Sequence, residues 1–159
     1  MVDVTKFSMG VTAASITSMG LIAGLQQGDS SKTGVVTGLL VVAVADNVSD
    51  SLGIHIYKES EGVSRQETML TTLGNFAARL VLALTFVAIV LLLSSRTAFI
   101  VASVWGLSLL AILSYLIAKK RKASTLEEVA LHLVIALVVI AGCRLLGNFI
   151  VRLMSHSVL

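Results

Sequence analysis

Two aspartates and an asparagine interrupt a long apolar stretch in the run ADNVSDSLGIHIYKESE, which begins at Ala45. At about 100° per residue of an α-helix, the polar residues of this run share one side: Asp46, Asn47, Asp50 and Ser51. Two carboxylates one turn apart can share a divalent cation, because hard metal ions prefer oxygen ligands, or they can share a proton. The spacing therefore predicts a site for a metal ion or for protons.

The neighbouring residues extend this hypothesis along the same helix. Asn47 and Ser51 would serve as neutral oxygen ligands beside the two carboxylates. His55, Glu59 and Glu61 follow toward the end of the helix, where we expect them to form a vestibule for the cation. The opposite side of the helix is apolar and would face lipid or other helices; it carries Val41, Val48, Leu52 and Ile56.

The composition is that of an integral membrane protein. Of 159 residues, 56% are hydrophobic and 13% are charged, and the mean hydropathy of +0.95 is well above that of soluble domains. A hydrocarbon core of about 30 Å needs roughly 20 helical residues. We therefore predict an all-α, single-domain protein spanning residues 1–159, with five transmembrane helices near 9–25, 34–57, 73–93, 98–118 and 126–153.

The basic residues indicate an orientation for these spans. With the N-terminus in the cytoplasm, seven Lys or Arg residues (6, 58, 65 and 119–122) lie on the cytoplasmic side and three (32, 96 and 152) on the other. Cytoplasmic loops are enriched in these residues, so N-in, C-out is expected. The charge of +3 then reflects topology rather than nucleic-acid binding. Membrane lipid is the expected surrounding, and a multi-pass location in the cell membrane is expected if the source is a prokaryote.

The acidic side of the second span has two interpretations. Asp46 falls about twelve residues from either end of its span, near the bilayer midplane. A carboxylate at that depth costs about 2.5–3.5 kcal/mol on insertion scales, so ionisable groups there usually belong to transport pathways. The alternative is a non-transporting scaffold or partner-binding subunit, in which the aspartates form structural ion pairs with Arg79 and Arg144.

Small residues recur at regular intervals in the first two spans. Gly20, Gly24 and Gly28 recur at four-residue intervals, as do Gly34 and Gly38, which favours close helix packing. These stripes could join the first two helices within one chain or form the seam of a homodimer. The chain has no nucleophile–base pair and no cofactor fingerprint, so we expect neither an enzyme nor a bound cofactor.

The second span resembles that of the vacuolar iron transporter family, small five-helix carriers of iron and manganese. The matching residues are Ala45-Asp46, Ser49, Leu52-Gly53 and Ser60-Glu61, and the segment ITSMGLIAGLQQG resembles the first span of the family. The resemblance implies a homodimer that exports ferrous or manganous ions from the cytoplasm, in exchange for protons, through a pathway between protomers.

This chain also differs from that family at several positions. The aspartate of the family's first helix falls at Ala13, the glutamate of its second helix at Ile54, and a methionine of that helix at Asp50. The glutamate-rich cytosolic region of larger members shrinks to KESEGVSRQET. Of the pathway residues, Asp46 is the position that matches, while Asp50 is assigned from helical spacing.

Overall fold

The computed structural model describes residues 5–27 and 31–156, and over these ranges the chain is helical without strands. Apolar runs of 20 residues or more form helices readily because the backbone then satisfies its own hydrogen bonds. The helices are α1 (Thr5–Leu25), α2 (Lys32–Ser60), α3 (Arg65–Leu92), α4 (Ser95–Arg121) and α5 (Thr125–His156).

All five helices are long and apolar enough to cross a membrane. Their outward surfaces are rich in exposed large apolar side chains, among them Val48 on α2, Leu91 on α3 and Val138 on α5. Such a surface is suited to lipid and not to water. These features indicate a multi-pass membrane protein. The N-in, C-out orientation stays a prediction.

The helices extend beyond the predicted spans, most clearly at the start of α3. This helix begins at Arg65, so the predicted start near residue 73 is wrong. The hydroxyl of Ser64 caps the helix by accepting a hydrogen bond from the backbone N–H of Glu67 at 3.4 Å. Counting apolar residues missed the first two turns because they are polar. The connection between α2 and α3 is therefore only the turn at residues 61–64.

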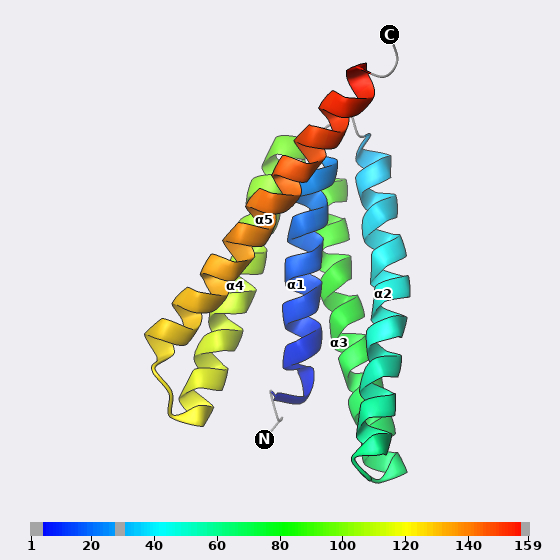
Figure 1. The fold of residues 1–159 in the computed structure, drawn as a ribbon, viewed down its shortest axis with the longest axis vertical. Helices are drawn as coiled ribbons and strands as arrows, with labels where there is room; N and C mark the ends of the chain where they lie inside the picture. The colour runs from blue at the N-terminus through cyan, green and yellow to red at the C-terminus, as the bar shows by residue number, and fades with distance from the viewer. Residues whose placement is uncertain (1–4, 28–30, 157–159) are drawn as a thin grey trace.

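The helices run up and down as one bundle, with α1 at its centre (Figure 1). α1 contacts each of the other four helices, while α2 packs against α1 and α3, and α5 packs against α1 and α4. The α2–α3 and α4–α5 connections lie at the same end of the bundle as the start of α1 (Figure 1). The basic run at residues 119–122 lies at that end too.

Glycines let α1 and α5 approach closely. A Cβ atom at Gly147 on α5 would collide with the backbone carbonyl oxygen of Gly24 on α1, and one at Gly20 would lie 3.0 Å from Cys143 Sγ. Gly20 and Gly24 thus pack against α5 and not against the second helix, which was one of the two predicted partners, and Gly28 lies outside the described residues. The homodimer seam stays a prediction. Gly38 does contact α1 from α2. Backbone contact of this kind holds α1 in the centre of the bundle.

Candidate functional site

Arg79 on α3 joins the two aspartates of α2. Its guanidinium makes ion pairs with both carboxylates, through Nη2 to Asp46 and through Nη1 to Asp50. Asp46 is fourteen residues from either end of α2, at Lys32 and Ser60. At about 1.5 Å per residue, that places the carboxylate about 21 Å from each end of the helix. We call Asp46, Asp50 and Arg79 the Asp–Arg triad.

Helical periodicity explains why these three side chains meet. The stripe of α2 that faces the bundle interior runs through Ala43, Asn47 and Ser51, all buried. Asp46 and Asp50 each precede a member of this stripe, so they lie at its border. Arg79 belongs to the buried stripe of α3, and its long side chain crosses from the interior to that border.

The triad carries more negative than positive charge. The Arg79 side chain is 4% exposed, whereas those of Asp46 and Asp50 are 42% and 47% exposed. Among the described side chains, no second Lys, Arg or His lies within ion-pair distance of either carboxylate. With both acids ionised, the triad therefore has a net charge of about −1, taking one unit charge per ionised group.

Asn47 and Ser51 point to the helix interface rather than to the exposed edges of the carboxylates. The Asn47 side-chain N–H donates to the backbone carbonyl of Phe76 at 3.0 Å, which ties α2 to α3. The Asn47 Oδ1 and Ser51 Oγ atoms are buried without a partner among the described residues. These predicted neutral ligands therefore line the interior behind the triad.

The predicted vestibule residues lie at the α2–α3 end of the bundle. His55 Nε2 is 3.3 Å from Glu59 Oε1, and His55 Nδ1 is 3.4 Å from the hydroxyl of Thr72. Glu61 is exposed and ends α2 as its C-cap residue. In residues 5–27 and 31–156, no three or more His, Cys, Asp or Glu side chains are grouped so as to hold a metal ion. The structure thus brings Asp46 and Asp50 together, while His55, Glu59 and Glu61 lie apart from them.

Arg144 does not join the triad. Its guanidinium lies 5.5 Å from the centroid of the Phe99 ring, a cation–π contact between α5 and α4. The predicted pairing of Arg144 with an aspartate is wrong because α5 packs on α1 and α4, away from the acids on α2. Only the Arg79 half of the predicted ion-pair network is present.

Sequence reasoning did not single out several buried polar residues on α1 and α3. Ser15, Thr68 and Asn75 are each 1% exposed or less. The signal was the spacing on α3, where Thr68, Thr71, Asn75 and Arg79 recur every three or four residues. This spacing places them on one face of the helix, and that face is buried.

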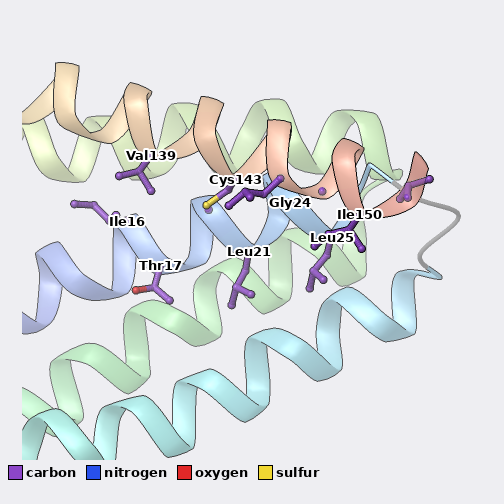
Figure 2. A pocket seen from close by; sticks show the side chains of 12 residues that line it. Ile16, Thr17, Leu21, Gly24, Leu25, Val139, Cys143 and Ile150 are labelled. Atoms are coloured by element: carbon purple, nitrogen blue, oxygen red, sulfur yellow. The ribbon is translucent and has the colours of Figure 1, made fainter. Parts of the chain in front are cut away.

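A groove of the bundle lies elsewhere, between α1 and α5 (Figure 2). It is an open groove of about 500 Å³, and its lining includes Ile16, Leu21 and Val139. Thr17 and Cys143 are its most polar side chains, and the described residues that line it carry no charge. The groove is therefore lined without a carboxylate among the described residues.

Comparison of the chain with models of known protein families, with curated proteins and with solved structures finds no match. The fold and the site therefore define the chain only by class, as a five-helix bundle of multi-pass membrane type with an acidic pair in the middle of its second helix.

Proposed function

We propose that the protein is a membrane transporter that carries a divalent metal ion in exchange for protons. The observation that supports this most is the Asp–Arg triad, in which one guanidinium stands between two carboxylates at the middle of two apolar helices. An uncompensated negative charge at that depth is costly, so the triad should attract a proton or a cation.

The triad offers two ways to satisfy its charge. In the first, the two carboxylates share one proton, as close pairs of acids do. In the second, a divalent cation binds between Asp46 and Asp50 and the proton leaves, so the net charge of the triad changes from about 0 to about +1, taking one unit charge per ionised group. Arg79 then loses part of its hold on the acids. The site thus holds either the proton or the metal ion, but not both. Binding of the metal ion then requires release of the proton, and this exchange is what coupled transport requires.

The chemistry of the ligands suggests the class of cation. Carboxylate oxygens are hard ligands that suit manganous and similar ions. The resemblance of the second span to the vacuolar iron transporters extends this to ferrous ions. His55, Glu59 and Glu61 would attract the cation at the α2–α3 end of the bundle. The half-exposed carboxylates would be covered by a second copy of the chain, in line with the homodimer that the resemblance implies.

A scaffold function is the second candidate, and the same ion pairs favour it. Arg79 is almost fully buried and is paired with both acids, as in a static structural network. In that case the triad would fix α2 against α3 and carry nothing. The transporter and the scaffold differ in one respect: only in the transporter do the two carboxylates exchange a proton for a metal ion.

Transport into liposomes tests the proposal. The purified protein is reconstituted, and entry of Mn²⁺ and Fe²⁺ is followed with a trapped indicator, with and without an imposed pH gradient. We expect entry that depends on the gradient. No entry of either ion, from protein that elutes as a single folded species, would refute the proposed transport and favour the scaffold.

A further inference from the structure

Four buried polar side chains on α2 and α3 have atoms without a hydrogen-bond partner among the described residues. We name them the polar seam; none is more than 6% exposed, and they are Asn47, Ser51, Thr68 and Asn75. Asn75 lacks a partner at both amide atoms. Buried polar groups are almost always hydrogen-bonded, either to protein or to ordered water. These atoms therefore point to a ligand that both donates and accepts hydrogen bonds.

The seam reaches all three helices at Asn75. A Cβ atom at Gly10 on α1 would lie 2.7 Å from Asn75 Oδ1, so this amide lies against the α1 backbone. On the other side, Asn47 on α2 bonds to the backbone of Phe76, the next residue of α3. Ser51 follows Asn47 by one turn on the same buried stripe. Unpartnered groups from α2 and α3 thus line one stretch of the interior.

The seam continues toward the α2–α3 turn. Thr68 lies about two turns before Asn75 on the same face of α3. One turn beyond Ser51 on α2, His55 meets the hydroxyl of Thr72. The His55 side chain is 24% exposed and its partner Glu59 is 59% exposed, so this end of the seam opens to the surface.

At the other end the seam stops at Arg79. A small cavity of about 10 Å³ follows, lined by Arg79, Thr17, Ser18 and apolar residues, and it approaches the space that one water molecule needs. Beyond it, the interior between α1, α2 and α3 is apolar and closely packed, with side chains that are at most 2% exposed: Ile22, Val35, Leu39, Phe86 and Val90. Along α2 and α3, the buried side chains are therefore polar on the side of Arg79 that faces the α2–α3 turn and apolar on the other side.

We propose that the polar seam holds a chain of water molecules that runs from the α2–α3 turn to Arg79 and ends there. Neutral hydroxyls and amides suit water, which makes two to four hydrogen bonds in buried sites. They suit a bare divalent cation poorly, because dehydrating such an ion requires charged ligands. The chain gives the Asp–Arg triad access to water from one end of the bundle only. The conduction of protons along this water chain rests on the proposed function, whereas the presence of the water chain does not.

Cysteine accessibility tests the seam without measuring transport. In a Cys143→Ser background, Ser51→Cys and Leu39→Cys place single thiols on the same buried stripe of α2, on opposite sides of the triad. Both proteins, in liposomes, receive a pulse of a small methanethiosulfonate on both sides of the membrane. The unmodified thiol is then counted by mass spectrometry after denaturation. Because thiols react as hydrated thiolates, Ser51→Cys should react roughly tenfold faster or more.

A second pair on α3, Thr68→Cys and Ala83→Cys, repeats the comparison and decides it if either α2 variant fails to fold. Equal rates within the folded pair would overturn the seam. If the Ser51→Cys thiol reacts faster but the protein transports no metal ion, the seam is supported and the proposed function is refuted. If the protein transports metal ions but the thiols of the pair react at equal rates, the proposed function is supported and the seam is refuted.

Discussion

Replacing both Asp46 and Asp50 by asparagine should reduce Mn²⁺ entry into liposomes by about 100-fold or more, because hard divalent ions require anionic oxygen ligands in a site of this kind. The amide oxygens can still accept the hydrogen bonds of Arg79, so the contact between α2 and α3 has a way to persist. The charge of the triad would change from negative to positive, which repels the cation.

A matched control removes the same charge at a distance. Glu127→Gln with Glu128→Gln changes two acids in the first turn of α5, far along the chain from the triad. This variant should retain entry within about twofold, because surface charges are screened over a Debye length. Full transport in the Asp46→Asn, Asp50→Asn protein would contradict the proposal. Loss of transport in both variants would mean that acids in general matter, and not the triad.

The second large effect concerns stability. Arg79→Leu leaves two carboxylates at mid-helix without their cation, and breaking a buried pair in this way costs about 3–5 kcal/mol. Because Asp46 and Asp50 are each about half exposed, we expect about 3 kcal/mol. The free energy of unfolding would be measured by denaturant titration in detergent micelles. Arg144→Leu is the matched control, and losing its contact with Phe99 should cost about 0.5–1 kcal/mol.

A double-mutant comparison separates the ion pairs from packing. If Arg79 stabilises the fold through the acids, then adding Asp46→Asn and Asp50→Asn to Arg79→Leu should restore much of the lost stability. Strictly additive losses would show that the arginine acts through its packing instead. The transporter and the scaffold both require this coupling, but only the transporter requires metal entry as well.

Much of the architecture could be predicted from local pattern. Long apolar runs indicate membrane-spanning helices, and the rotation per residue placed Asp46 and Asp50 on the side of α2 away from Val48 and Leu52. The start of α3 at Arg65 could not be found by hydropathy, because its first turns are polar and are held by the Ser64 cap.

The partner of the acids could not be decided from sequence alone. Arg79 and Arg144 both lie inside apolar helices, so each was a candidate. The choice depends on which helix packs beside α2, and this is set by tertiary contacts: α3 is its neighbour, while α5 lies against α1 and α4. The partner of the α1 glycines could not be decided from sequence for the same reason, since a small-residue stripe permits close packing without specifying its partner.

The exchange of a proton for a metal ion at the Asp–Arg triad is tested most directly by counting the protons that metal binding displaces. Titration calorimetry of Mn²⁺ into the purified protein, in buffers of different ionisation enthalpy, gives this number. We predict the release of about one proton per chain at neutral pH from the wild-type protein, and none from the Asp46→Asn, Asp50→Asn variant. Binding without proton release, or the same release from both proteins, would contradict the exchange of proton for metal at the Asp–Arg triad.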